Sequence, residues 1–435
     1  MNKTRVRVGV VGGGAAGIMA AITAAESGAF VTLFEGGERV GKKILSTGNG
    51  KCNFGNRILD PTCYYGADRT WLRECLSQFD TDATVRFFAA NGMLIKEKNG
   101  YLYPLSEQAS TVLDVLRTRL RTAGVQVVTG KKGTRVEAGF TVYTGDEPHR
   151  FDRVILACGG KAAPKTGSDG SGYLLAKELG HRIVPVVPAL VQLRCRETFM
   201  KEIAGVRADA VVRVLSQGPE EIAERGELQL TDYGISGIPV FQMSRRVNYI
   251  QLHAAELHPH ASEPHPHASG KASQEVEVSI DFLPDYTLQE LEDMLKRRLA
   301  QVADRTVEEF FTGLLNKKLM LLMIKLAGLK RDVAASTADR QALYAVLQLC
   351  KAFTVHVTGS NSFDNAQVCA GGVDTAQVGT DMQSRLVQGL YFAGEMLDVD
   401  GRCGGYNLQW AWCSGHIAGR QAAGCSASAG EIDTK

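Results

Sequence analysis

The stretch VRVGVVGGGAAGIMAAITAAESGAFVTLFEG, residues 6–36, decides the fold. Its apolar beginning, residues 6–11, predicts a buried strand, and the alanine-rich part from about Ala15 to Ser27 predicts a helix. The run VTLFE at 31–35 predicts a second strand. A strand, a helix and a strand in this order form a βαβ unit, which is typical of a parallel sheet with helices on its faces.

The glycines of this unit have the G-x-G-x-x-G spacing of a dinucleotide-binding turn. Gly12 allows a sharp turn, Gly14 lets the backbone approach a pyrophosphate, and Gly17 lets the helix pack close to the sheet. The helix N-terminus then offers free N–H groups to the phosphates. Glu35 closes the second strand where a carboxylate is expected to bind a ribose diol, which disfavours a 2′-phosphate. The predicted dinucleotide residues here are Gly12, Gly14, Ala15, Ala16, Gly17, Glu35 and Gly36.

Two further glycine-rich segments favour FAD over NAD as the dinucleotide. GKKILSTGNGKCN at 41–53 predicts a flexible basic turn suited to phosphates and the flavin edge, and an NAD dehydrogenase has no need of it. LYFAGEMLDVDGRCGGYNLQWAWCSG at 390–415 combines a strand, acidic residues and a diglycine that leads into a helix. In two-dinucleotide-fold flavoproteins, a carboxylate of such a segment contacts the ribitol or pyrophosphate. The dipole of the following helix stabilises negative charge on the reduced flavin.

The sequence therefore predicts a composite FAD site. The strand at 154–157 and the glycines after it are expected to contribute to it as well. The predicted residues beyond the first unit are Lys42, Lys43, Thr47, Gly48, Asn49, Gly50, Cys52, Asn53, Ala157, Gly159, Gly394, Glu395, Asp398, Gly404, Gly405, Tyr406 and Asn407.

Composition bounds the kind of protein. A chain of 435 residues predicts two or three domains, and a net charge of +2 indicates no nucleic-acid surface. No uncharged apolar run is long enough to span a membrane, and the N-terminal glycine pattern argues against a signal peptide. Ten cysteines without a C-x-x-C pair predict reduced thiols and no metal site. We therefore expect a cytoplasmic protein with a small-molecule substrate; the sequence leaves the oligomeric state open.

The pattern of apolar and polar residues changes after Pro188. Residues 191–250 alternate like strands, and helices are expected at 288–300, 307–328 and 338–351. Between them, residues 253–274 hold five of the nine histidines together with Ala, Ser and Pro, which predicts a mobile surface loop without a core. In the first part of the chain, residues 71–92 predict one helix, and LIKEKNGYLYP predicts a hairpin that turns at Asn99–Gly100.

Several stretches together resemble the HI0933-like flavoproteins, also called the aminoacetone-oxidase-like or bile-acid-reductase-like family. They are GGGAAG at 12–17, GKKILSTGNGKCN at 41–53, the stretch 154–181, GELQLTDYGISGIPV at 226–240, CAGGVDT at 369–375 and the stretch 392–415.

The resemblance implies an α/β fold, with a Rossmann-like two-dinucleotide-binding FAD domain and an inserted domain. The FAD domain would comprise 1–190 and 354–435. The insert, a small β-barrel with helices at 191–353, would cap the flavin. The family usually has Thr-His where this chain has Thr231-Asp232, before Tyr233 and Gly234, which leaves the choice of substrate open.

Flavin chemistry restricts the possible reactions. Reduction of an activated C=C needs hydride from flavin N5 and a proton from the protein, for which Tyr233 and Tyr406 are the candidate donors. Three hypotheses remain. The first is an NAD(P)H-dependent reductase of an enone or dienone, such as a 3-oxo-Δ4 steroid or bile acid. The second is an amine or aminoketone oxidase that uses O2. The third is a flavoprotein that serves a partner in electron transfer or RNA modification. No second G-x-G-x-x-G occurs, so a reductase would use NADH or NADPH as a transient donor or take electrons from another protein.

Overall fold

The computed structural model describes residues 5–137, 139–215, 220–257 and 275–424. Contacts divide the chain into two compact units. The first unit comprises Met1–Val187 and Gln367–Lys435, and the second comprises Pro188–Ala366. The insert is therefore bounded by two crossings of the chain, after Val187 and before Gln367.

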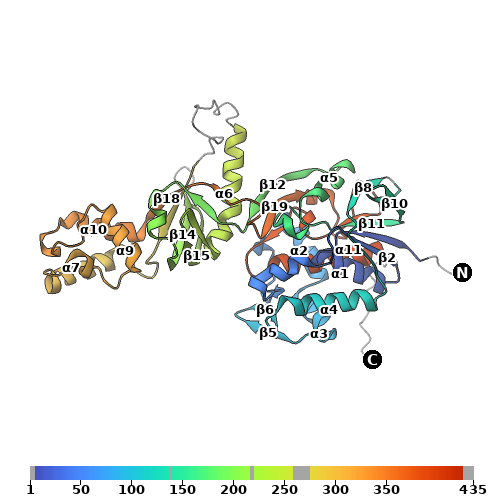
Figure 1. The fold of residues 1–435 in the computed structure, drawn as a ribbon, viewed down its shortest axis with the longest axis horizontal. Helices are drawn as coiled ribbons and strands as arrows, with labels where there is room; N and C mark the ends of the chain where they lie inside the picture. Colours follow the sequence, from blue (N-terminus) through green and yellow to red (C-terminus); the bar gives the residue numbers. More distant parts are fainter. Residues whose placement is uncertain (1–4, 138, 216–219, 258–274, 425–435) are drawn as a thin grey trace. The chain divides into compact units, whose positions relative to one another are not determined.

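A five-stranded parallel sheet forms the centre of the first unit (Figure 1). Every pair of neighbouring strands in it is parallel. Val8 and Val10 of the central strand are fully buried, as expected for a parallel sheet covered on both faces. This sheet confirms the predicted Rossmann-type α/β class. Its strands, in spatial order, are β20 (Leu390–Phe392), β11 (Arg153–Leu156), β1 (Arg7–Val11), β2 (Phe30–Glu35) and β7 (Gln126–Thr129).

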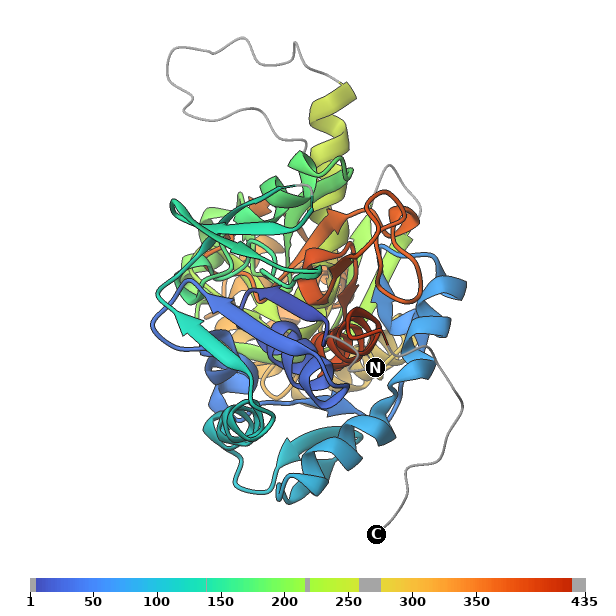
Figure 2. The same ribbon diagram turned by 90° about the vertical axis from the view of Figure 1, so that its right-hand side faces the viewer.

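Two helices from opposite ends of the chain pack directly against each other in this unit. Helix α1 (Ala15–Glu26) follows β1, and α11 (Tyr406–Ala422) is the last helix described; Figure 2 shows the blue and the red segments together. A Cβ added to Gly415 would lie 2.4 Å from the Ala16 carbonyl oxygen, and one added to Gly419 would lie 2.3 Å from that of Ala20. Because both contacts advance along the two helices in the same direction, the helices run parallel.

The remaining elements of the first unit surround this core. Residues 71–92 were predicted as one helix, but they form parts of two, because the Asp80 carboxylate accepts the Ala83 N–H and starts a new helix there. The elements are α2 (Arg69–Gln78), α3 (Thr81–Ala90), α4 (Ala109–Thr122), α5 (Ser171–Glu178), the sheet of β3 (Gly55–Asn56), β6 (Tyr101–Pro104) and β5 (Ile95–Lys98), the sheet of β8 (Gly133–Glu137), β9 (Thr141–Thr144) and β10 (Glu147–Arg150), the pair β4 (Tyr64–Tyr65) with β21 (Asp400–Gly401), and the pair β12 (Ile183–Ala189) with β19 (Val368–Val373).

A closed six-stranded barrel forms the second unit and confirms the predicted barrel. Its interior is apolar, with Val212, Val278 and Val355 fully buried. The prediction returned the chain to the first unit at 354, whereas β18 pairs with both β13 and β17 and so closes the barrel. The strands, in order around the barrel, are β13 (Leu193–Cys195), β16 (Gly234–Gly237), β15 (Glu220–Leu230), β14 (Arg207–Leu215), β17 (Val276–Asp281) and β18 (Phe353–Ser360).

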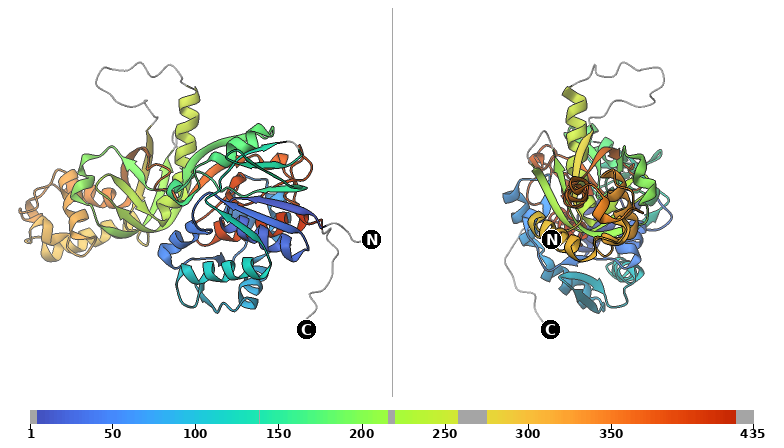
Figure 3. Two further views of the ribbon diagram at one scale, coloured as in Figure 1. Left: turned by 45° about the vertical axis from the view of Figure 1, so that its right-hand side comes forward. Right: turned by 90° about the vertical axis from the view of Figure 1, so that its left-hand side faces the viewer.

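Helices complete the second unit, and Figure 3 shows those of residues 288–351 in yellow to orange beside the barrel strands. Residues 238–250 were predicted as strand-like but form part of a helix, and the helix predicted over 307–328 is interrupted between Phe310 and Lys317. Of the predicted His-rich loop at 253–274, residues 253–257 instead end the helix that starts at Ile238, and 258–274 lie outside the described residues. No described helix is long and apolar enough to cross a membrane. The helices are α6 (Ile238–Leu257), α7 (Leu288–Val302), α8 (Val307–Phe310), α9 (Lys317–Leu326) and α10 (Arg340–Lys351).

One buried histidine gives the stability of the first unit a pH dependence. His416 on α11 stacks on Phe79 with ring centroids 4.3 Å apart, and its Nδ1 lies 3.3 Å from Thr23 Oγ1. Burial, aided by the nearby Arg420 charge, lowers the pKa of His416 to about 4, from an ordinary value near 6.5. Between these two pKa values, His416 is protonated in the unfolded chain but neutral in the folded chain. The free energy of unfolding therefore decreases as the pH falls from about 6.5 towards 4.

We expect the His416→Phe variant, which keeps an aromatic ring but cannot be protonated, to lose less stability between pH 6.5 and pH 4.5 than the native chain. When the free energy of unfolding is plotted against pH, the slopes of the two proteins should differ by up to about 1.4 kcal/mol per pH unit. All three tryptophans (Trp71, Trp410 and Trp412) lie in the first unit, so urea unfolding followed by tryptophan fluorescence reports that unit alone. Equal slopes for the two proteins would show that His416 is not the source of the pH dependence.

Candidate functional site

A cavity of about 440 Å³ lies at the carboxyl ends of the parallel strands of the first unit. Its volume falls in the range of small-molecule and cofactor sites. The segments that line it directly follow four neighbouring strands, which is where open α/β sheets bind their ligands. These segments are Gly12–Gly14 after β1, Gly36–Gly37 after β2, Ala157–Gly159 after β11 and Ala393–Glu395 after β20.

The N-terminus of α1 opens into this cavity. Gly12 has a φ of +107°, and a Cβ there would lie 2.4 Å from the Ala157 carbonyl oxygen, so only glycine makes this turn. A Cβ on Gly17 would lie 1.8 Å from the Gly12 carbonyl oxygen, whereas one on Gly14 would meet nothing within 4 Å. No side chain caps the helix, so the N–H groups of its first turn are available to a phosphate.

Glu35 is fixed at the end of β2 by the backbone. Its Oε2 accepts the Gly13 N–H at 2.9 Å, and its Oε1 accepts the Gly37 N–H at 2.6 Å. Each carboxylate oxygen keeps a further lone pair, so the group can still accept hydrogen bonds from a ribose diol. The hydrogen bonds orient the carboxylate before any ligand arrives.

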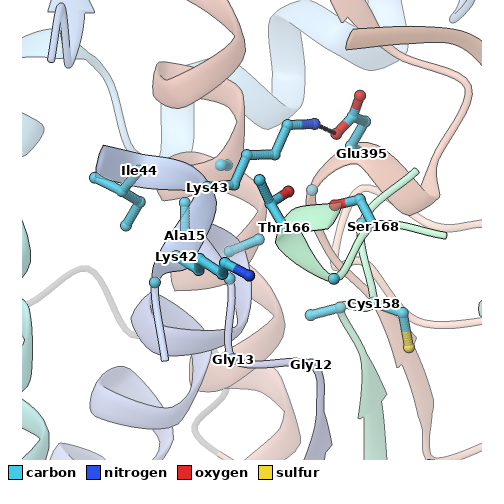
Figure 4. A pocket seen from close by; sticks show the side chains of 18 of the residues that line it. Gly12, Gly13, Ala15, Lys42, Lys43, Ile44, Cys158, Thr166, Ser168 and Glu395 are labelled. Carbon is cyan, nitrogen blue, oxygen red and sulfur yellow. Dashed lines mark hydrogen bonds and ion pairs between the residues drawn. The ribbon is translucent and has the colours of Figure 1, made fainter. Parts of the chain in front are cut away.

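Two lysines of the 3₁₀ segment η1 (Lys42–Gly50) join the walls of the cavity. Figure 4 shows the Lys43 ammonium directed at Glu395, and the two groups are 2.9 Å apart. The other oxygen of Glu395 accepts the Cys369 N–H at 2.8 Å. Lys42 Nζ donates to the Lys165 carbonyl oxygen at 2.7 Å. The basic segment predicted at 41–53 thus connects chain segments that are more than a hundred residues apart.

The first turns of α11 form a further part of the cavity lining. Leu408, Trp410 and Ala411 line it, and no side chain caps the helix at Gly405. The Asn407 side chain also reaches the lining, but it is engaged with Gly401, accepting its N–H and donating to its carbonyl oxygen at 2.8 Å each. Asn407 therefore fixes the turn that starts α11.

The predicted cofactor residues divide into two groups. Those that line the cavity are Gly12, Gly14, Ala15, Ala16, Glu35, Gly36, Lys42, Lys43, Thr47, Ala157, Gly159, Gly394, Glu395 and Asn407. Those outside its lining are Gly17, Gly48, Asn49, Gly50, Cys52, Asn53, Asp398, Gly404, Gly405 and Tyr406.

Several residues outside the lining have structural contacts of their own. Gly17 packs on Gly12, and Asp398 Oδ1 accepts the Gly371 N–H at 3.1 Å. Burial raises the pKa of the Cys52 thiol to about 11, so this cysteine is not a reactive thiolate.

The two candidate proton donors lie in different units. Tyr406 belongs to the first unit and is almost fully buried; burial first, and then a hydrogen bond with the Cys63 thiol, raise the pKa of its hydroxyl well above the ordinary value. Tyr233 belongs to the second unit, where the Asn361 amide donates to its hydroxyl at 3.2 Å and the Arg194 guanidinium lies 5.4 Å from its ring centroid. Both residues stay proposals as proton donors.

Sequence reasoning missed a second group of lining residues. Lys132 follows β7, the fifth strand, so the rule of carboxyl ends would have pointed to it once the strand order was known. The stretch Pro164–Asp169 lies within the family stretch 154–181, but none of its residues was named as a site residue. No group of three or more potential metal ligands occurs in the part of the chain that the structure describes.

The residues present fit FAD. The open space at Gly14 leaves room for a pyrophosphate beside an uncapped helix, and Glu35 is oriented for a ribose. The start of α11 lies about 12 Å before that of α1 along the shared helix direction, since eight more residues precede its first glycine contact, at 1.5 Å each. A long, two-ended ligand can therefore meet both uncapped N-termini.

Comparisons with known proteins agree with the motifs. The HI0933-like protein Rossmann domain matches residues 6–421, which confirms the resemblance. The 3-dehydro-bile acid delta(4,6)-reductase of Clostridium scindens is 44% identical over 96% of this chain and 99% of its own. The ribosomal RNA dihydrouridine synthase of Haemophilus influenzae is 28% identical over 94% and 96%.

Solved structures resemble the chain more distantly. The 3-ketosteroid-delta4-(5alpha)-dehydrogenase of Rhodococcus jostii covers 97% of this chain and 98% of its own, with 15% identity and a TM-score of 0.46. Likeness at that level carries no functional conclusion.

Two glycine substitutions distinguish a glycine that faces the cavity from a glycine that packs against the backbone. We expect Gly14→Ala to leave the thermal stability of the apoprotein unchanged but to weaken FAD binding at least about tenfold, because its methyl group enters open cavity space. Gly17→Ala should lower the melting temperature of the apoprotein, because its methyl group meets the Gly12 carbonyl. Calorimetry and flavin-fluorescence titration measure the two effects. Unchanged FAD affinity in Gly14→Ala would remove this glycine from the site.

Proposed function

We propose that this chain, which belongs to the HI0933-like family, is an FAD-dependent reductase of a C=C bond conjugated to a ketone. The proposed substrate is a 3-oxo steroid with Δ4 or Δ4,6 unsaturation, of the bile-acid class. The observation that carries the proposal is the identity of 44%, over nearly the full length of both chains, with a 3-dehydro-bile acid delta(4,6)-reductase.

Bound FAD would supply hydride at its N5, and the residues of this chain would do the rest. The first turn of α1 and the Glu35 carboxylate would hold the pyrophosphate and the ribose. The uncapped start of α11 would hold negative charge on the reduced ring, because its N–H groups and dipole favour an anion there. Lys43, kept in place by Glu395, adds a positive charge inside the same cavity.

The electron donor that we propose is NADH or NADPH. The sequence contains a single G-x-G-x-x-G, so the nicotinamide nucleotide would bind transiently rather than occupy a second Rossmann site. A cytoplasmic location belongs to the same proposal, because the cysteines of the described residues are all free thiols and a nicotinamide donor is available there.

A second candidate function is supported by the relatives from Haemophilus influenzae and Escherichia coli, which are 28% and 27% identical and are ribosomal RNA dihydrouridine synthases. Formation of dihydrouridine also adds hydrogen to a C=C bond conjugated to a carbonyl. The two candidates therefore share the chemistry and differ in the molecule that carries the double bond. The higher identity favours the steroid.

An anaerobic two-step assay tests these proposals. Purified FAD-loaded protein is first mixed with NADH or NADPH, and we expect the flavin absorbance to bleach. The reduced protein is then mixed with a 3-oxo-4,6-diene bile acid or with an unmodified ribosomal RNA transcript, and mass spectrometry follows the product. Reoxidation by the steroid, with two hydrogens added per double bond, is the expected result. Reoxidation by the RNA alone would replace the steroid proposal, and bleaching by an amine instead of NAD(P)H would favour an oxidase.

The same assay tests the proton donor. If Tyr406 donates the proton, Tyr406→Phe should bind FAD and be bleached normally but reduce substrate about a hundredfold or more slowly. Tyr143→Phe is the matched control, since its hydroxyl bonds Glu137 and neither residue lines the cavity. If Tyr406→Phe keeps its full rate and Tyr233→Phe does not, the donor is Tyr233.

A further inference from the structure

The loop Gly159–Gly170, which follows β11, forms one wall of the cavity. Figure 4 shows its Thr166 and Ser168 among the side chains that line the cavity together with Lys42 and Lys43. The loop is closed on itself, because the Gly170 N–H donates to the Gly160 carbonyl oxygen at 3.0 Å. Compact surface loops whose ends meet in this way are Ω-loops, which are frequently functional.

The base of this loop is firmly held. The Lys161 N–H donates to the Cys369 thiol at 3.0 Å, and Cys369 is buried. A Cβ on Gly160 would lie 3.1 Å from both Cys369 Sγ and Glu395 Cδ, so the backbone is packed tightly there. Displacing the base would therefore disturb buried contacts of β19 and of the Glu395 segment.

Two lysines from other segments hold the loop as well, Lys42 near its tip and Lys132 beside its C-terminal base, where Asp169 precedes Gly170 and also accepts the Ser171 N–H. Lys132 Nζ pairs with the Asp169 carboxylate at 2.5 Å, and Lys42 Nζ donates to the Lys165 carbonyl oxygen at 2.7 Å. The Lys132 and Asp169 side chains are 47% and 43% exposed, so water and salt compete with their attraction. Gly167, between the two fastened positions, lies next to Glu35, with an added Cβ 3.8 Å from its Oε1.

We propose that the loop Gly159–Gly170 is a strap that retains FAD, anchored at Gly160 and Lys161 and fastened by Lys42–Lys165 near its tip and by Lys132–Asp169 beside Gly170. Release of these exposed contacts opens the ribose end of the cavity, and closure covers it again. Lys132 and Asp169 are therefore positioning residues that act on the cofactor through the loop. The inference rests on FAD binding in this cavity, as in the proposed function, but not on the identity of the substrate.

The test is the rate at which FAD leaves the protein. Holoprotein is mixed with excess apoflavodoxin, which traps released FAD, and the rate is measured for the native chain, Lys132→Met, Asp169→Asn and the double variant. We expect each single variant to release FAD roughly twofold to fivefold faster, which is the range for an exposed ion pair. The double variant should be no faster than either single variant, because both remove the same pair.

The opposite charges of Lys132 and Asp169 distinguish a strap from direct attraction to the phosphates. Direct attraction predicts that loss of Lys132 speeds release and loss of Asp169 slows it, whereas a strap predicts that both losses speed release. The charge-swapped variant Lys132→Glu with Asp169→Lys should restore slow release. The neighbouring exposed pair Lys131–Glu147, whose groups are 2.9 Å apart outside the cavity lining, is the matched control, and its removal should change nothing.

The outcomes separate this inference from the proposed function. A native protein that binds no FAD overturns both. A native protein that binds FAD but releases it at the same rate as the single variants, or more slowly after loss of Asp169, overturns the strap alone. Faster release in both single variants supports the strap even if the reduced protein acts on no steroid.

Discussion

The close approach of α1 and α11 is the constraint on which the site depends. Where the two helices meet, glycines on one face the backbone of the other, so the helix axes lie nearer than larger side chains would allow. The contact also sets direction and offset, since Ala16 meets Gly415 and Ala20 meets Gly419. Both N-termini therefore point towards the same end of the unit, one about 12 Å beyond the other. A cavity with two separate anion-binding ends is the direct result.

The parallel sheet places the residues of the cavity that do not belong to the two helices. Its strands deliver Gly12, Glu35, Ala157 and Glu395 to one edge, although these residues are spread over almost four hundred positions of the sequence. Because the order of the strands is fixed by parallel pairing, the polar groups are placed by the backbone, and small residues keep the space between them open. Lys43 and Glu395 then join the walls, and together they give the cavity paired charges rather than an isolated one.

Local patterns in the sequence predicted much of the fold and of the cavity lining. The features that were missed depend on pairing between segments far apart in the sequence. Glu35 was predicted because a carboxylate ends the second strand, and the structure places it on the cavity wall, oriented by Gly13 and Gly37. The break at Asp80 was missed, because it depends on one N-cap residue between two stretches that are both helical. Lys132 had no local signal, because its place in the site follows from β7 pairing with β2. The C-terminal limit of the barrel was missed because β18 is recognised by its partners β13 and β17, which lie far away in sequence.

The pairing of β12 with β19 has a consequence for how such proteins diversify. The chain leaves the first unit after Val187 and returns before Gln367, and Pro185 and Gly371, close to these two crossings, lie against each other. A segment whose two ends emerge side by side from one ribbon can be lengthened, shortened or exchanged without cutting the sheet beneath it. The barrel and its helices thus form a segment that can be exchanged as one piece. Related chains can therefore differ in this segment while they keep the cofactor cavity of the first unit.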